Sequence, residues 1–481
     1  MLQKEGFQIQ VSSEIGDLRR ILIHSPDKGL GQVVPSKAQD WLFEDIVHLE
    51  SIRKKEYDLY VKVLLYFLDP ELIKGKLQII DAKNSTREFY KPNKPGFYAS
   101  NKVIELETLL ADVLNQQTVG QQLVAAVCAT EGCSYQQQEM LMGLSSTKLA
   151  SLLISGTTPD GKIFFAPLPN LIFTRDLGTT INNYILLNKP ARKARSREAL
   201  LTKYIFFNHS YFENYRNNIL EVPQSEEHFL IPEGEIDVQN TLEGGDVMMV
   251  SKNHLLIGCG ERTTPQAASE VIKILFEKNV VQKVTVIRIP HQRNFMHLDT
   301  VFTHVKKNLW VLLSSLFNPE ETKKEFSPIN HLIDAKKTDR PEIIQFQNGK
   351  TNTPRKFNKL EELLSDISEN ELGSKEKTQF IYSGNNVFPY DSREQWTDSC
   401  NLLALKEGVV LGYDRNDKTI AAFEENGFTV TKAADLLQKL ENNELQTENI
   451  SNTLITFPSA ELSRARGGFH CMSMPLFREE F

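Results

Sequence analysis

The sequence lacks several features that would assign it directly to a class of protein. No apolar run in its 481 residues approaches the length of a membrane-spanning helix, so we expect no membrane partner. The polar stretch from Met1 to Glu14 lacks the apolar core of a signal peptide. The formal net charge of −7 shows no basic excess, which weighs against a nucleic-acid partner.

Cysteine is scarce, and its spacing indicates no metal site. Of the five cysteines, Cys128 and Cys133 lie close together, but no second pair of His or Cys residues completes a zinc site. An odd number of cysteines in a chain without an export signal favours reduced thiols. We therefore expect a cytoplasmic location.

The remaining composition is ordinary for a globular protein, with 40% hydrophobic and 24% charged residues. Leu18–His24 reads as a strand, and the apolar spacing predicts helices over Gln39–Ile73 and Gln121–Ile154, with Met140 among the candidate core residues. We therefore predict a helical insertion domain over 71–155 and a main body formed by 1–70 and 156–481.

The main body contains a weak internal repeat. An apolar strand and polar turn at His254–Arg262 precede a helix that Thr264 should cap, and a strand returns at Gln282–Ile289. The same order recurs from Val409 onward, with a strand, a polar turn, a helix and a second strand at Phe428–Thr431. This repeat predicts stacked β/α modules but does not fix their number.

One long segment departs from this pattern. Residues 318–377 are rich in Lys and Glu and show little sustained apolar period. A segment with so little to bury is typical of a partly ordered surface insertion, remote from any chemistry.

Four short runs carry groups suited to catalysis: Pro169–Asp176, Glu243–Asp246, Met296–Thr300 and Arg466–Pro475. Together they contain a thiol, an imidazole, several carboxylates and several arginines. A nucleophilic thiol needs a partner that moves protons, and a cationic substrate needs anions to hold it.

Each of these groups also has an ordinary interpretation. A lone cysteine such as Cys471 is most often a buried packing residue, although Arg464 and Arg466 nearby favour a thiolate. In a strand, His297 and Asp299 lie on one face, where the carboxylate would favour the protonated imidazole. The ordinary alternative is a strand that merely carries polar groups at its rim.

The acidic and basic runs are equally ambiguous by themselves. The glycines after Glu243 would let it approach and orient His297, but a glycine turn with acids is commonly only a turn. Asp176 beside Arg175 is most simply a solvated ion pair, and the basic run Ala191–Glu198 a solvated stretch.

The order of these runs resembles the arginine deiminases, members of the guanidine-modifying enzyme superfamily. The resemblance extends from about Val11 to Pro475, and beyond the four runs it includes Ser13–Arg20, Leu42–Asp45, Arg393–Trp396 and Gly412–Asn416. It implies a closed α/β propeller of five ββαβ modules, with the active site at the centre and the helical domain inserted.

The resemblance also implies a role for each catalytic residue. Cys471 would attack the guanidinium carbon. His297, oriented by Glu243, would donate a proton to the departing ammonia and then activate water. Asp176 and Asp299 would clamp the planar guanidinium through paired hydrogen bonds.

The amino-acid end of such a substrate carries a carboxylate, for which arginines are natural ligands. The resemblance places Asn170, Arg195 and Arg262 there, and Arg466 is a further candidate for binding the substrate. Arg195 stands in the basic run, in which Arg192 and Arg197 compete for the same role.

The resemblance therefore implies hydrolysis of L-arginine to L-citrulline and ammonia through a covalent cysteine–amidino intermediate. We expect no metal, no organic cofactor and a homo-oligomer, a dimer or higher. An amidinotransferase on the same fold and a non-catalytic arginine-binding protein are the alternatives. A papain-like hydrolase is disfavoured because its nucleophile lies near the mature N-terminus, unlike Cys471.

Overall fold

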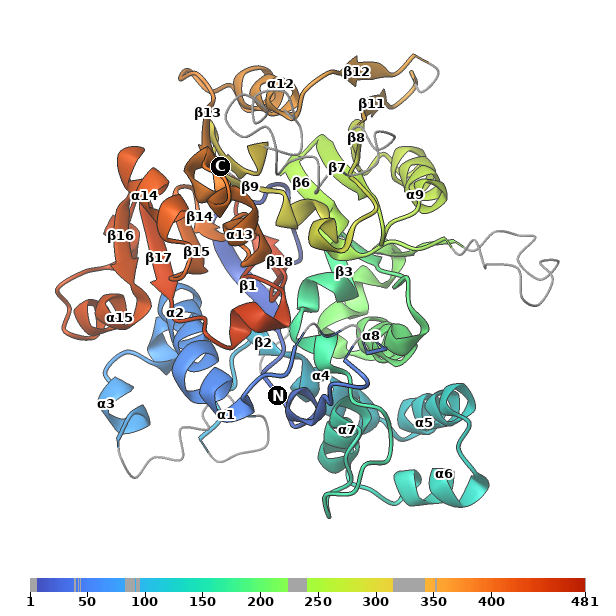
Figure 1. The fold of residues 1–481 in the computed structure, drawn as a ribbon. Coiled ribbons are helices and arrows are strands. Elements are labelled where there is room, and N and C mark those ends of the chain that lie inside the picture. The colour runs from blue at the N-terminus through green and yellow to red at the C-terminus, as the bar shows by residue number, and fades with distance from the viewer. Residues whose placement is uncertain are drawn as a thin grey trace.

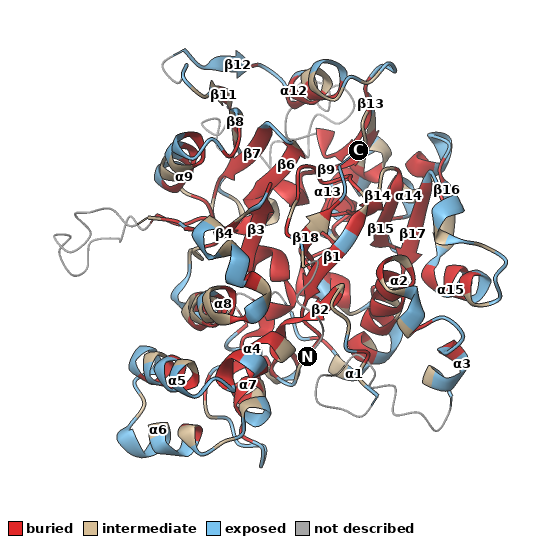
Figure 2. Ribbon diagram, turned by 180° about the vertical axis from the view of Figure 1, so that it is seen from behind, coloured by how far each residue is buried: buried red, intermediate tan, exposed pale blue. Residues whose placement is uncertain are grey.

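The computed structural model describes residues 7–38, 40–41, 43, 45–82, 91, 96–223, 240–314, 342–350 and 353–480. Helices and strands are mixed along the whole chain, so the fold is of the α/β type (Figure 1). Most strands are buried, although β11, β12 and β16 are partly exposed, and the helices outside the buried strands turn one face to solvent (Figure 2). No helix among these residues is both long and apolar enough to cross a membrane.

Within the described residues the strands form five sheets. The first sheet has the order β18–β1–β2, with β18 (Met474–Arg478), β1 (Leu18–Ile23) and β2 (Val103–Glu105), and the second has the order β3–β4–β5, with β3 (Gly178–Ile181), β4 (Tyr184–Leu187) and β5 (Ile219–Glu221). The third and largest has the order β12–β11–β8–β7–β6, with β6 (Val247–Ser251), β7 (His254–Cys259), β8 (Lys283–Arg288), β11 (Ile343–Gln347) and β12 (Arg355–Phe357). The fourth has the order β13–β10–β9, with β9 (Phe302–Lys306), β10 (Leu309–Leu312) and β13 (Gln379–Tyr382), and the fifth has the order β14–β15–β17–β16, with β14 (Leu403–Lys406), β15 (Val409–Tyr413), β17 (Thr453–Phe457) and β16 (Thr429–Lys432).

The helices lie between these strands in the sequence. Their bounds are α1 (Leu49–Ser51), α2 (Asp58–Leu68), α3 (Leu77–Ile80), α4 (Leu106–Leu114), α5 (Gln117–Glu131), α6 (Tyr135–Met142), α7 (Ser146–Ser155), α8 (Ser196–Asn208), α9 (Pro265–Glu277), α12 (Leu360–Asp366), α13 (Tyr390–Trp396), α14 (Asp417–Glu425) and α15 (Ala433–Glu441).

One pairing scheme recurs in all five sheets. A central strand pairs antiparallel with one neighbour and parallel with a strand that follows a helix, as β7 does with β6 and β8. The central strands of the other sheets are β1, β4, β10 and β15. In the first sheet the antiparallel neighbour of β1 is β18, so this sheet joins the two ends of the chain (Figure 1).

Both copies of the predicted internal repeat are confirmed. The apolar run at His254 forms β7, every residue of which is buried, and β8 returns parallel to it. Thr264 caps α9 by accepting a hydrogen bond from the backbone N–H of Ala267, with Pro265 in the first turn. The second copy forms β15, α14 and β16.

The first predicted helix begins later than the sequence indicated. Helical structure starts at Leu49 and continues through a π-helical segment, Ile52–Tyr57, into α2. Ile46, which the apolar pattern placed on the core face, is 42% exposed. Of the residues that carried the prediction and the resemblance here, Gln39, Leu42 and Glu44 lie outside the described part of the chain.

The predicted helical insertion over 71–155 does contain α4 to α7, and α5 and α6 lie at the periphery of the molecule (Figure 1). It also contains β2, which pairs in parallel with β1 and so belongs to the first sheet. Met140, a predicted core residue, is exposed because it lies on the solvent side of α6. The domain boundaries themselves stay a prediction.

The expectation that 318–377 has little to bury is wrong for its described part. Strand β11 pairs with β8 along five residues, and α12 fully buries Leu360, Leu363 and Leu364. Three leucines at helical spacing suffice for one short buried helix, but the charged residues around them conceal this period in a wider window. Residues 318–341 and 351–352 lie outside the described part.

Candidate active site

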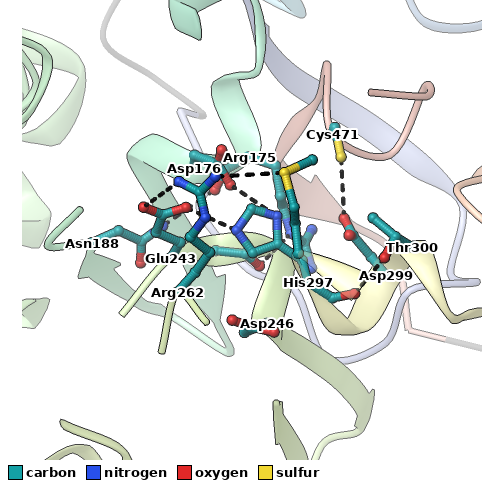
Figure 3. A network of polar contacts seen from close by, with 12 residues as sticks. Arg175, Asp176, Asn188, Glu243, Asp246, Arg262, His297, Asp299, Thr300 and Cys471 are labelled. Carbon is teal, nitrogen blue, oxygen red and sulfur yellow. Dashed lines mark hydrogen bonds and ion pairs between the residues drawn. The ribbon is translucent and has the colours of Figure 1, made fainter. Parts of the chain in front are cut away.

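The four runs identified in the sequence share one structural feature, which is their position next to the start of a strand. Three of the runs end one or two residues before β3, β6 or β9, and the fourth, which carries Cys471, continues into β18. The side chains of these runs lie around one centre, although they are distant in sequence (Figure 3). Turns next to strand ends are where a rigid scaffold can hold polar side chains around a common centre.

The predicted strand at His297–Asp299 is wrong. Leu298–Thr300 forms a 3₁₀ turn that begins at His297, so the alternation expected of a strand does not apply. The imidazole and Asp299 bind different partners: Nε2–H of His297 donates to Glu243 at 2.8 Å, while Asp299 Oδ2 lies 2.8 Å from Nδ1 of His470.

His297 is surrounded by carboxylates. Besides Glu243, its Nδ1 lies 4.0 Å from Oδ1 of Asp176 (Figure 3). Burial would lower the pKa of His297, but Asp176, Glu243 and Asp246 outweigh it and raise the pKa to about 10. Gly245 is required beside this ring, because an added Cβ would lie 2.7 Å from its Cγ.

Glu243 and Asp246 have different surroundings. Burial would raise the pKa of Glu243, yet His297, Arg195 and Arg262 hold it well below the usual range. Asp246 is buried, which raises its pKa to about 7, and it accepts bonds from Thr263 Oγ1 at 2.6 Å and from the backbone N–H of Leu298 at 2.9 Å. Asp246 thus ties the turn after His297 to the turn that carries Arg262.

Cys471 is buried, and its sulfur lies 3.6 Å from Oδ2 of Asp299 (Figure 3). Burial, followed by the charges of Asp299, Asp176 and Asp398, raises the pKa of this thiol well above its ordinary value. The expectation that nearby arginines favour a thiolate is therefore wrong for this geometry. One of the two, Arg464, is largely exposed and pairs with Asp45 at 2.9 Å.

The sequence did not reveal Asn401, whose side-chain Nδ2 lies 3.1 Å from the sulfur of Cys471. Asn401 is buried and lies two residues before β14. The sheet that contains β14 is the one to which none of the four runs is attached. The position of Asn401 before a strand is therefore the same as that of Asp176 or Asp246. That position, once the strand had been recognised, was the signal available in the sequence.

Two carboxylate oxygens near the thiol lack hydrogen-bond donors. Among the described residues, neither Asp176 Oδ1 nor Asp299 Oδ1 accepts a hydrogen bond, although both are buried. A buried carboxylate oxygen without a partner is costly, and such groups in a native protein call for an explanation. A ligand that brings several N–H donors would satisfy both oxygens.

The three competing arginines of the basic run occupy different environments. Arg195 is buried in the site, where Nη1 binds Asp176 at 2.9 Å and Nε binds Glu198 at 2.8 Å. Arg192 is exposed near Glu261. Arg197 is buried away from the site against Glu131, so the expectation of a solvated run is wrong at Arg195 and Arg197.

The other predicted substrate residues also line the site. Nδ2 of Asn170 donates to the backbone oxygen of Trp41 at 2.6 Å. Arg262 Nε makes no hydrogen bond with any described residue. The guanidinium of Arg466 stacks on the ring of Trp396 at 3.5 Å from its centroid, with the Arg466 backbone in the left-handed region (φ 60°).

One small cavity connects these side chains. Its lining includes Asn170, Asp176, Arg195, Arg262, His297, Arg466 and Cys471, and its volume is about 30 Å³. That volume is far below the roughly 300–1,000 Å³ of pockets that enclose small-molecule ligands. A ligand the size of an amino acid can therefore bind only if some of the lining side chains move.

Asp176, Glu243 and His297 also bring three potential metal-ligand atoms within 4.8 Å of one another. Arg195 lies 2.9 Å from Asp176 and 3.5 Å from Glu243, and Arg262 lies 3.9 Å from Glu243. These guanidinium groups already neutralise the carboxylates and would repel a divalent cation. The donor set therefore fits a metal ion poorly.

Comparison with known proteins identifies the family. Residues 134–478 match the family model described as arginine deiminase. Proteins named arginine deiminase from Staphylococcus aureus (strain JH9) and Staphylococcus haemolyticus (strain JCSC1435) are each 30% identical to this chain, over 98% of it and 98% of their own length. The chain belongs to the arginine deiminase family.

The chain also has weaker likenesses to solved structures. An amidinotransferase from Microseira wollei aligns over 98% of both chains, with 12% identity and a TM-score of 0.44. The N-terminal domain of an arginine dihydrolase from cyanobacteria covers 64% of this chain and 76% of its own, with 15% identity and a TM-score of 0.36.

Proposed function

We propose that this chain hydrolyses L-arginine to L-citrulline and ammonia, with Cys471 as the nucleophile. Family membership supports this activity. The structural observation that carries the assignment is the pair of buried carboxylates, Asp176 and Asp299, each with one oxygen that accepts no hydrogen bond from the described residues. Asp299 lies beside the thiol, and Asp176 lines the same cavity as Cys471.

A guanidinium group fits these two carboxylates. It is planar, cationic and rich in N–H donors, so two carboxylates can hold it flat with its carbon accessible to the sulfur. Asp176 already binds one guanidinium, that of Arg195, through Oδ2, and its Oδ1 is left for a second.

The positive charge of the substrate would favour deprotonation of the Cys471 thiol. Carboxylates, led by Asp299, add to burial in keeping Cys471 protonated. A bound guanidinium between those carboxylates compensates their charge and so favours loss of the thiol proton. Oδ2 of Asp299, at 3.6 Å from the sulfur, is an acceptor within reach of that proton.

His297 has the protonation state of a general acid, because its pKa is raised to about 10. Glu243 holds Nε2–H, so Nδ1 is the nitrogen left to exchange protons with the substrate. In our proposal the thiolate forms a bond to the guanidinium carbon, and His297 protonates the nitrogen that leaves as ammonia. The neutral imidazole then takes a proton from water, which attacks the same carbon and releases citrulline and the thiolate.

Arg262 is the residue best placed to bind the substrate's carboxylate. It lines the cavity, and its Nε has no hydrogen-bond acceptor among the described residues. Asn170 and Arg466 line the same cavity and are proposed to assist. Arg195 is bound to Glu198 through Nε and to Asp176 through Nη1, and we propose that it assists through its remaining N–H donors.

We also propose that the five sheets are five ββαβ modules of one α/β propeller. The recurrent pairing scheme supports this, as does the position of the site residues before the first strand of every sheet. The division into 1–70, 71–155 and 156–481, with an insertion near 318–377, remains our proposal. The cytoplasmic location, the homo-oligomeric state and the independence from metal and cofactor likewise remain predictions.

The rival activity is amidino transfer, in which an amine replaces water in the second step. Incubation of the purified chain with arginine alone, without an amine acceptor, distinguishes the two. We expect citrulline and ammonia in equal amounts. Product formation that depends on an added amine would instead identify a transferase, and binding of arginine without any product would leave the non-catalytic alternative.

A further inference from the structure

Asn401 occupies the position in its sheet that catalytic side chains occupy in the others. It lies on the turn before β14, with a side chain that is almost completely buried. Its side-chain amide binds Cys471 and the backbone of Asp299, which are both buried.

The orientation of the Asn401 amide is fixed by two backbone groups. Oδ1 accepts the backbone N–H of Cys471 at 3.0 Å, and Nδ2 donates to the backbone oxygen of Asp299 at 3.2 Å. An exchanged amide would set a donor against the N–H and an acceptor against the carbonyl oxygen, so only one orientation satisfies both. In that orientation Nδ2–H must face the sulfur, 3.1 Å away.

We infer that Asn401 is a catalytic residue whose amide N–H stabilises the thiolate of Cys471. This inference rests on the proposed function. The thiolate carries negative charge twice in the reaction, before it attacks the guanidinium and when it leaves the thiouronium intermediate. A donor held in place at both moments needs no reorganisation, which is how preorganised donors accelerate a reaction.

The surroundings of Asn401 keep this contact rigid. A Cβ added to Gly468 would lie 2.5 Å from the backbone oxygen of Asn401, so the loop before Cys471 packs directly against it. The backbone N–H of His470 also points to that oxygen, at 3.5 Å. Carboxylates surround the thiol and disfavour its negatively charged form. The N–H of Asn401 is a neutral hydrogen-bond donor that favours the thiolate.

The test compares Asn401→Asp with the wild-type chain. The substitution keeps the shape and the acceptor for Cys471 N–H, but it removes the N–H donor to sulfur. The thiol pKa is read from the pH dependence of alkylation of Cys471 by iodoacetamide, followed by peptide mass spectrometry. We expect alkylation near neutral pH to slow by about tenfold or more, since one pKa unit is a factor of ten. We also expect kcat to fall by about 10²–10³, with KM changed far less.

Asn416→Asp is the matched control, because Asn416 is also buried but bonds Thr397 outside the site. It should leave the alkylation profile of Cys471 unchanged. Asn401→Ala, which removes the donor without adding a carboxylate, should raise the thiol pKa as well. An unchanged profile in both folded Asn401 variants would overturn the inference.

If neither variant folds, the contact between Asn401 and Cys471 can still be tested by NMR on the wild-type chain. With asparagine selectively isotope-labelled, one side-chain amide resonance should move with the titration of Cys471 and should not move in Cys471→Ala. The absence of any such resonance would refute the contact. These readouts do not depend on turnover, so a chain that forms no citrulline would contradict the proposed function while the Asn401 contact is still measured.

Discussion

Nε2 of His297 lies 2.8 Å from Oε2 of Glu243, and both side chains are buried. Glu243 keeps its charge despite burial, because His297 and two arginines hold its pKa below the usual range. The imidazole is correspondingly held in its protonated form, with a pKa of about 10. The pair therefore sets both the orientation and the proton content of the general acid.

Glu243→Gln should move the alkaline limb of kcat to lower pH. His297 must be protonated to act as an acid, so activity falls as the pH rises through its pKa in the complex. Removing one carboxylate lowers that pKa from about 10 toward the ordinary value of 6.5. The pH profile of kcat for the variant and the wild type measures the displacement, and coincident profiles would show that Glu243 does not control the proton on His297.

His297→Ala should lower kcat by about 10²–10⁴ with a smaller effect on substrate affinity, since general acid and base groups contribute that much to rate. Steady-state kinetics on arginine test this. His304→Ala is a suitable comparison, because His304 is buried but stacks on Trp310 away from the site. If His297→Ala retained its kcat, His470, which binds Asp299, would be the next candidate for the proton donor.

Cys471→Ser should abolish turnover while the fold and arginine binding persist, because a serine hydroxyl is a far weaker nucleophile near neutral pH. Calorimetric titration with arginine measures binding, and ammonia release measures turnover. Cys259→Ser provides the control, since Cys259 is buried in β7. Acid quench of the wild type should trap a covalent adduct on Cys471, and an adduct on any other residue would exclude Cys471 as the nucleophile.

The sequence was informative where short motifs and strong local signals coincide. The apolar run of β7, the Thr264 cap and the polar runs before strands all depend on neighbouring residues, so they could be recognised without a structure. The structure brings together eight of the nine residues predicted for the site along one cavity, and the ninth, Asp299, contacts the sulfur of Cys471.

What the sequence did not reveal depends on contacts between distant segments. The strand expected at His297 is a 3₁₀ turn because Asp246, from another sheet, binds the backbone of Leu298. Asn401 carries no motif, and its role arises only from its distance to Cys471. The pKa of the Cys471 thiol is likewise raised by burial and by carboxylates that are far away in the sequence.

The buried face of α12 predicts that the segment after 341 contributes to stability. Leu363→Ala removes a fully buried side chain and should destabilise the chain by about 2–5 kcal/mol, as is typical for such truncations. Lys359→Ala, at an exposed neighbouring position, should have little effect. Denaturant unfolding measures both. Equal stability of the two variants would restore the original view that this region has little to bury.

Agmatine, which is arginine without its carboxylate, should be a poor substrate. In our proposal that carboxylate pairs with Arg262, whose side chain is 7% exposed and whose Nε has no acceptor among the described residues. Agmatine would leave Nε of Arg262 buried without a hydrogen-bond acceptor, so we expect kcat/KM to be lower than for arginine by roughly 10²–10⁴.

Much of the loss with agmatine should appear in kcat, because binding energy at the carboxylate end positions the guanidinium over the thiol. Arg262→Ala sharpens the test. It should reduce kcat/KM for arginine strongly and for agmatine only slightly, so that the ratio between the two substrates narrows. If the substitution impaired both equally, Arg262 would act through Glu243, 3.9 Å away, rather than on the carboxylate. Comparable kcat/KM values for the two substrates in the wild type would mean that the physiological guanidine lacks an amino-acid carboxylate.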